Sequence, residues 1–322
     1  MSSYKFDLIS PGEAKAFWDT SPHASVFTNP EVLHKLSQRV DWWLAWKGNE
    51  PACLWPVCMP DNKSVELPLF TYYVGPMWSQ IAYDIPVSRW LASSMQVYGG
   101  FIKLFIEKYN RIKTCLPVGL TDVRVFDWWN YGESDKPRFA IQPRYTARIE
   151  SLQDLDDEQI IVGFRKNDKR YALRRIMKTG PPPFTDEWDV HDFIRLYDQT
   201  MKRQGLATNE RITNQIRSLV DLVHSGFGEV IACKDPDTGE VISLRLLLYG
   251  KGVANGVINL VADSWQQRDL PVWIAYNSIK ISRERGMHCF DFNGANSPNR
   301  GDEKHSYGAA PVLYFQCQYP GK

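Results

Sequence analysis

Apolar residues recur along the first half of the chain in two periods, one typical of helices and one typical of strands. In residues 86–110 the period is helical and predicts one long amphipathic helix, with a weak point at a Gly-Gly pair. Prolines in two β-rich segments place these strands at sheet edges or bulges. Further helices are expected at residues 11–17 and 29–39, and strands at residues 52–60, 64–73, 122–129 and 144–150.

The second half is easier to divide, because turn-forming residues separate its periodic segments. Helices are expected at residues 156–178, 189–203, 212–223 and 271–286. Residues 229–249 alternate around a Pro-Asp-Thr-Gly turn and predict a hairpin, and two more strands follow at residues 252–263 and 288–294. This order is typical of one α/β domain built on a mixed sheet. The first half shows a less regular version of the same order of elements, which indicates a duplicated domain. We therefore expect an α/β protein with two domains, at residues 1–145 and 146–322.

Composition narrows the class of protein. The 322 residues are 43% hydrophobic and 23% charged, enough for two ordinary cores. A formal charge of +1 supplies no general attraction for nucleic acid, so we expect no DNA partner. The first residues lack the pattern of a secretion signal, in which a cationic region precedes an apolar one, and no run of eighteen apolar residues follows. We therefore expect a cytoplasmic protein with no membrane partner. The six cysteines stand apart, without zinc-site spacing, which predicts reduced thiols and no metal.

The most basic part of the chain is residues 164–180, with seven Lys or Arg and one acid. On a helix Lys166, Arg170, Arg174 and Lys178 follow one another at four-residue steps and line one side. One interpretation is an ordinary solvated face. The other is recognition of a diphosphate, because Arg offers a planar pair of donors and Lys a point charge.

A second group of polar residues surrounds the end of the last expected strand. Asp291 and Asn293 alternate with two phenylalanines, so the polar pair shares a face and can point into a cleft. The loop that follows carries Asn296, Lys304, His305 and Tyr307. Loops positioned by a sheet often carry function. His305 is interpreted either as a surface hydrogen-bonding residue or as a base, and Tyr307 either as a packing residue or as a proton donor.

Three segments together resemble the FemAB-like N-acyltransferases. Residues 143–180 resemble the Arg-Tyr-Thr strand and basic helix of that family, and residues 288–309 its terminal strand and K-x-x-[FY]-G element. Residues 67–78 resemble the aromatic, glycine-terminated strand of its first domain. The resemblance implies two GNAT-like (acyl-CoA N-acyltransferase) domains in tandem, each a mixed, mostly antiparallel sheet flanked by helices. It also implies that only the second domain forms a complete acyl-donor site.

The resemblance further implies transfer of an acyl group to a primary amine. Lys304 and Tyr307 occupy the K-x-x-[FY]-G positions, and we take them, with Asp291 and His305, as catalytic candidates. The general base stays unassigned, because Asp291, Asp263 and His305 can each take that role. Candidates for substrate binding are Tyr72, Tyr73, Tyr145, Arg170, Asn293 and Asn296.

GNAT-like domains usually bind the coenzyme A diphosphate with an R/Q-x-x-G-x-G/A loop, and this chain departs from that pattern. The corresponding residues read QQRDLPVW, in which Gln267 and Arg268 remain as donors. The helix that begins at Pro271 still presents backbone N–H groups to an anion. For the oxyanion of the reaction we expect backbone N–H groups of the strand around Leu260 to Asp263, with Lys304 as an auxiliary charge. The candidates for cofactor binding are Gln267, Arg268, Leu260 and Val261.

The expected reaction therefore uses acyl-CoA as co-substrate, without a metal. The leading acceptor is a nucleotide-linked amino sugar, as in surface polysaccharide, lipopolysaccharide or O-antigen biosynthesis, since the basic segment suits a diphosphate and aromatic residues suit a base or sugar. An alternative is aminoacyl-tRNA-dependent transfer to a peptidoglycan precursor, against which the chain shows no long coiled-coil insertion and no general positive charge for tRNA. A third is a non-catalytic ligand-binding relative. The acyl group, the amine and the oligomeric state stay open.

Overall fold

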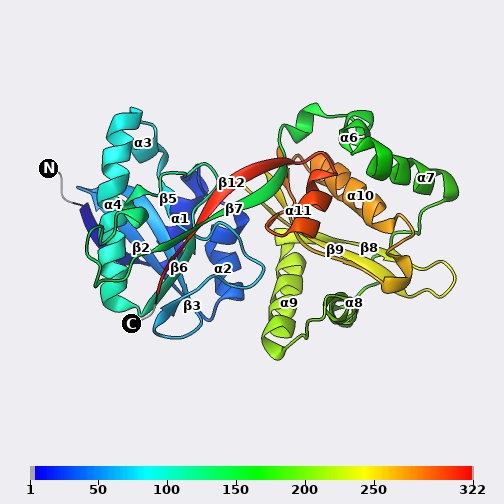
Figure 1. Ribbon diagram of the computed structural model, residues 1–322, viewed down its shortest axis with the longest axis horizontal. Helices are drawn as coiled ribbons and strands as arrows, with labels where there is room; N and C mark the ends of the chain where they lie inside the picture. Colours follow the sequence, from blue (N-terminus) through cyan, green and yellow to red (C-terminus); the bar gives the residue numbers. More distant parts are fainter. Residues whose placement is uncertain (1–3, 321–322) are drawn as a thin grey trace. The chain divides into compact units, whose positions relative to one another are not determined.

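The computed structural model describes residues 4–320, which group into two compact units (Figure 1). The first unit extends up to Arg144 and takes up the chain again from Leu313, whereas the second spans Tyr145–Val312. The last strand, β12 (Ala310–Tyr319), thus contributes most of its length to the first unit. Within residues 4–320, no helix is long and apolar enough to cross a bilayer.

The first unit contains an antiparallel sheet in the order β1-β2-β3-β5. Its central strand carries Pro56, which has no N–H to donate, and Pro56 pairs with Trp42 of the neighbouring strand. On the other side β5 pairs only with Cys53 and Leu54, so the proline lies beyond that pairing, in keeping with the expected edge position. The strands are β1 (Tyr4–Ile9), β2 (Arg39–Lys47), β3 (Glu50–Met59) and β5 (Met77–Trp78).

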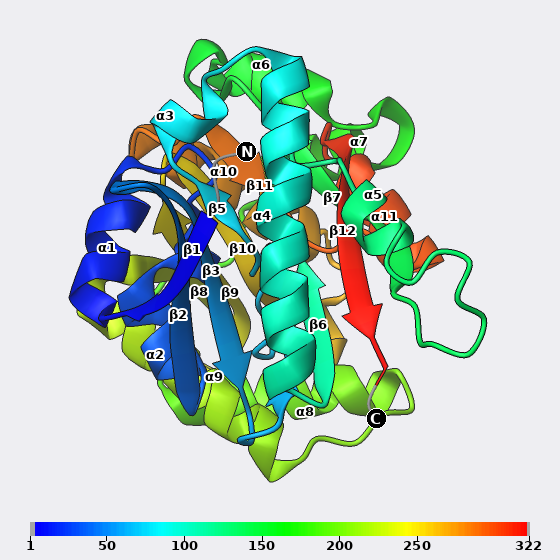
Figure 2. The same ribbon diagram turned by 90° about the vertical axis from the view of Figure 1, so that its left-hand side faces the viewer.

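The long helix α4 (Val87–Lys108) covers this sheet, as Figure 2 shows. Its Gly-Gly pair does not interrupt it. A Cβ atom on Gly100 would lie 2.2 Å from the ring of Phe6, so the bare glycine lets β1 approach the helix closely. The core between them is aromatic: Trp55 packs edge-on against Tyr98, Phe101 and other rings.

Two expected strands of the first unit are wrong. Residues 64–73 form only β4 (Ser64–Val65), and residues 122–129 contain a helix, α5 (Arg124–Asp127). The Asp122 carboxylate accepts from the backbone N–H of Arg124 at 3.2 Å, which supports a helical start in place of a strand. The remaining elements are α1 (Pro11–Thr20), α2 (Pro30–Leu36), α3 (Gln80–Tyr83), β6 (Arg111–Cys115) and the beginning of β7 (Ala140–Ile149).

The second unit is built on a mixed sheet in the order β7-β11-β10-β9-β8. The expected hairpin and third strand are confirmed, since β8, β9 and β10 are consecutive and antiparallel. Strand β11 pairs parallel with β10 and antiparallel with β7, which makes the sheet mixed but mostly antiparallel, as predicted. The strands are β8 (Gly228–Lys234), β9 (Val241–Gly250), β10 (Val253–Val261) and β11 (Cys289–Asp291).

Helices α8, α9 and α10 agree with expectation, but the single helix expected at residues 156–178 is wrong. It is broken at Phe164, which is extended and fully buried, with its ring 5.3 Å from that of Tyr307. A π-helical turn over Lys166–Arg170 then leads into the next helix. The loop expected after β11 also contains a helix, α11. The bounds are α6 (Asp157–Gly163), α7 (Tyr171–Thr179), α8 (Val190–Arg203), α9 (Glu210–Leu222), α10 (Leu270–Glu284) and α11 (Pro298–His305).

Candidate active site

Strands β10 and β11 are paired over only three positions, the last being Asn255 with Asp291. Directly afterwards the register of β10 shifts between Gly256 and Ile258, and Asn293 takes a left-handed φ of 56°. The two parallel strands therefore stop pairing and diverge within a few residues. Peptide groups further along β10 lack a strand partner on that side.

The peptide groups of β10 alternate in direction. The N–H of Ala262 donates to the carbonyl of Ile242 on β9, at 2.8 Å. By alternation, Leu260 also faces β9, whereas the peptide of Val261 faces the unpaired side. On that side the Val261 carbonyl accepts from Gln266 Nε2 at 2.8 Å. Among the N–H groups expected to face an oxyanion, that of Val261 points to the unpaired side, whereas those of Leu260 and Ala262 face β9.

Asp291 lies at the end of β11 and is fully buried. Its carboxylate accepts from the Thr146 hydroxyl, from Arg148 Nε at 2.8 Å and from the backbone N–H of Asn293 at 2.7 Å. These contacts join β11 to β7 and bend the chain after the strand. The carboxylate is thus engaged in holding the site together.

Lys304 holds the same loop from α11. Its ammonium donates to the carbonyl oxygens of Asn293 at 2.5 Å and Gly294 at 2.8 Å. The Asn296 side-chain oxygen accepts from the backbone N–H of Tyr145 at 2.7 Å, which ties the loop to β7. The structure therefore brings five predicted site residues into one network: Tyr145, Asp291, Asn293, Asn296 and Lys304.

Tyr307 is buried, and its ring stacks on Phe292 with centroids 5.6 Å apart. Its hydroxyl donates to Glu303 at 3.2 Å. Burial, reinforced by the negative charge of Glu303, raises the pKa of Tyr307 well above its ordinary value. The phenol therefore stays protonated throughout the physiological range.

Other predicted residues have different surroundings. His305 Nδ1 lies 2.8 Å from the carbonyl oxygen of Ala309, within its own turn. Arg170 donates from Nε and one terminal nitrogen to the Phe164 carbonyl, at 3.3 and 3.1 Å, and so caps the end of α6. Tyr72 and Tyr73 belong to the first unit, where both rings pack against Phe27.

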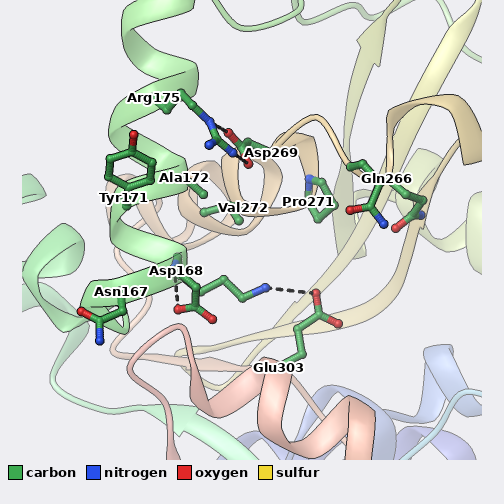
Figure 3. A pocket seen from close by; sticks show the side chains of 12 residues that line it. Asn167, Asp168, Tyr171, Ala172, Arg175, Gln266, Asp269, Pro271, Val272 and Glu303 are labelled. Atoms are coloured by element: carbon green, nitrogen blue, oxygen red, sulfur yellow. Dashed lines mark hydrogen bonds and ion pairs between the residues drawn. The ribbon is translucent and has the colours of Figure 1, made fainter.

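A cavity of about 410 Å³ lies beside the N-terminus of α10 (Figure 3). Two ion pairs cross its walls: Lys169 with Glu303, at 3.9 Å, and Arg175 with Asp269, at 2.5 and 2.6 Å. Gln267 lines the cavity, whereas Arg268 stacks over the ring of Trp265 at 4.7 Å. The lining residues are Asn167, Asp168, Lys169, Tyr171, Ala172, Arg175, Gln266, Gln267, Asp269, Pro271, Val272 and Glu303.

The start of α10 has no side-chain cap. Asp269 occupies the N-cap position with a left-handed φ of 60°, but its carboxylate binds Arg175 and accepts no helix N–H group. Contrary to expectation, the first turn of this helix offers few backbone donors, because Pro271 has no N–H and the N–H groups of Val272 and Trp273 donate to the carbonyl oxygen of Asp269, at 3.1 and 3.2 Å. The cavity therefore offers an anion mainly side-chain donors, Gln267 and Arg175 among them.

Comparison with known proteins identifies the domain. Residues 163–305 match the family model described as an acetyltransferase (GNAT) domain. The structure is similar to that of FemX, with a TM-score of 0.63 and 13% identity over 97% of this chain and 96% of that one. It is also similar to a tandem GNAT protein from the clavulanic acid biosynthesis pathway, with a TM-score of 0.56 and 10% identity over 99% of both chains. No curated protein sequence matches the chain.

A third solved structure, L-PGS from Bacillus licheniformis, has a TM-score of 0.52 and 13% identity, covering 98% of this chain and 93% of that one. At such identities these likenesses establish the fold, and they confirm the predicted GNAT-like architecture. The family match lies within the second unit, which contains both the opening between β10 and β11 and the cavity beside α10. The match of residues 163–305 to a GNAT acetyltransferase domain, together with the tandem GNAT fold, supports acyltransferase activity.

Proposed function

We propose that the protein transfers an acyl group from acyl-CoA to the primary amine of a nucleotide-linked amino sugar, with the donor bound in the second unit. The observation that carries this proposal is the coincidence of two features. Pairing between β10 and β11 ends after Asn255, and α10 begins within ten residues of the end of β10. Gln266 joins the two, because it lines the cavity and also donates to the Val261 carbonyl.

The donor phosphates fit the cavity beside α10. The Gln267 amide supplies hydrogen bonds, and Arg175 supplies charge. Arg175 already donates two hydrogen bonds to the Asp269 carboxylate, a geometry that a phosphate oxygen pair can replace. The thioester then extends toward the opening, where the Val261 N–H is positioned for its carbonyl oxygen.

The reaction requires a neutral amine to attack the thioester carbon, forming the C–N bond and a tetrahedral oxyanion. Collapse breaks the C–S bond and releases the CoA thiolate, while the amine loses one proton to water or to the departing sulfur. The Val261 N–H stabilises the oxyanion. Positioning of the two substrates supplies much of the acceleration, since amines are good nucleophiles. We also assign the protonated Tyr307 hydroxyl as a side-chain hydrogen-bond donor in the active site of the second unit.

The choice of acceptor rests on the basic segment and the aromatic residues of the chain. In the structure Arg165 is paired with Asp168 and Asp302, and Arg174 with Glu158, whereas Lys166 and Lys178 are exposed. The arginine pairs are on the surface, where such pairs contribute little, so a diphosphate can displace them at small cost. This exposed basic segment then binds the diphosphate of the acceptor.

The test is release of free CoA thiol from acetyl-CoA and longer acyl-CoAs in the presence of UDP- and TDP-linked amino sugars, with mass spectrometry of the product. We expect thiol release that depends on the amine, and a nucleotide sugar heavier by one acyl group. The hydroxy sugar without the amine is the matched control. Silence with every pair, together with transfer from a charged tRNA to a peptidoglycan precursor, would replace this proposal with the aminoacyl alternative.

A further inference from the structure

Arg245 is a charged residue inside the apolar strand β9 of the second unit. Only 4% of it is exposed, and its Nε is buried without a hydrogen-bond partner. Among the side chains that the structure describes, no carboxylate forms an ion pair with it. Burial lowers the pKa of Arg245 to about 10, so the guanidinium is still charged at neutral pH.

The surroundings of Arg245 compensate for only part of this burial, although Tyr307 and Glu303 act favourably on its charge from a distance. The guanidinium lies over the rings of Phe290 and Phe292, at 5.5 and 5.3 Å. Cation–π contacts of this kind offset only part of the cost of removing an ion from water. A buried cation without an ion-pair partner is a candidate for a site where a ligand supplies the missing charge.

A second unsatisfied group lies at the same place. Asn293 is 1% exposed, and its side-chain oxygen has no hydrogen-bond donor. Its amide nitrogen donates to the carbonyl of Gly256 at 3.3 Å. Arg245 also touches this glycine, because a Cβ atom there would lie 2.5 Å from one terminal guanidinium nitrogen. Both groups therefore converge on Gly256, where β10 bulges and its pairing with β11 ends.

We infer that Arg245 and Asn293 bind an anionic group of the acceptor, a carboxylate or a phosphate that stands close to a polar hydrogen. The guanidinium takes two anionic oxygens, and the Asn293 oxygen accepts the hydrogen of a neighbouring amine or hydroxyl. This inference rests on the proposed function, which places the donor phosphates beside α10 and leaves this anion to the other substrate. Lys304 acts as a positioning residue, since it holds the Asn293 carbonyl.

The experiment measures binding by calorimetry at constant ionic strength, without acyl-CoA. The probes are glycine, which pairs a carboxylate with an amine, phosphoethanolamine, which pairs a phosphate with an amine, and glycinamide, which lacks the anion. Arg245→Met removes the charge at similar length. Gly256→Ala keeps the charge but places a methyl group where the guanidinium lies. Arg217→Met, at an exposed position of α9, is the matched control.

We expect wild type and Arg217→Met to bind one anionic probe at least tenfold more tightly than glycinamide, and both site variants to lose that preference. Preference for glycine identifies a carboxylate, and preference for phosphoethanolamine identifies a phosphate. Equal binding of all three probes by wild type overturns the inference. So does a preference that survives in Gly256→Ala and Arg245→Met; if Arg245→Met does not fold, Gly256→Ala decides alone. Because no turnover is needed, failure of the thiol-release assay leaves this result interpretable.

Discussion

The ammonium of Lys304 lies 2.5 Å from the carbonyl oxygen of Asn293 and donates a hydrogen bond to it. Lys304 matches the lysine of a K-x-x-[FY]-G element, a position for which we expected direct participation in chemistry. The contact shows a holding role: a charge on α11 keeps the chain after β11 in the turn that Asn293 enters with a positive φ.

We predict that Lys304→Met lowers the free energy of unfolding by about 1.5–3 kcal/mol, the usual worth of a hydrogen bond to a charged group. Urea denaturation followed by circular dichroism measures it. The control is Lys166→Met, an exposed lysine that should stay within about 0.5 kcal/mol of wild type. An inactive Lys304→Met enzyme with unchanged stability would return this lysine to direct catalysis.

Two variants test the donor cavity with opposite signs. Asp269→Asn removes the anion that holds Arg175 beside α10, so we expect CoA to bind more tightly. Arg175→Met removes the charge itself and should weaken CoA binding about tenfold. Titration calorimetry with CoA measures both. If both variants bind CoA as wild type does, the phosphates lie elsewhere.

Gly100→Ala tests the close approach of α4 to β1. The added Cβ atom would lie 2.2 Å from the Phe6 ring, so the pair must separate, at a cost of about 1–3 kcal/mol. Gly99→Ala is the matched control, because its nearest neighbour would be a Val125 methyl at 3.9 Å. That variant should stabilise the protein by up to about 1 kcal/mol through helix propensity. Equal effects in thermal denaturation would contradict the packing described.

The stability of the first unit should depend on the protonation of His23. Burial lowers the pKa of His23 to about 4, from an ordinary value near 6.5, and its ring packs edge-on against Tyr83. Below pH 6.5 His23 binds a proton in the unfolded chain but stays neutral in the folded chain. The free energy of unfolding therefore decreases as pH falls from 6.5 toward 4. Urea midpoints at pH 7 and pH 5 measure this loss. It should be smaller in His23→Gln, and an equal loss in both proteins would exclude His23 as the source.

Local periodicity was sufficient for most of the fold. Helices α4, α8, α9 and α10 and the β8–β9 hairpin follow from patterns contained within each segment. The failures depend on distant contacts. A strand-like pattern at residues 122–129 became helix α5, whose Val125 and Phe126 enter the aromatic core, and the expected helix at residues 156–178 broke because Phe164 is buried against Tyr307.

The candidate site divides in the same way. The sequence alone predicted the polar cluster after β11, since Asp291, Asn293 and Lys304 occur within fourteen residues at the end of a strand. It could not show that Arg170 would donate to backbone carbonyls at the end of α6, because a charge pattern does not name its partner.

Arg245 illustrates the limit most clearly. In the sequence it is one basic residue within ISLRLLLY, a signal that alternation on a half-exposed strand explains equally well. Only the tertiary structure buries it against two phenylalanines, with no carboxylate paired to it among the described side chains. Sequence patterns report the period of burial along one segment, whereas the partner of a buried charge is decided by segments far away in the chain, and those meet only when the protein is folded.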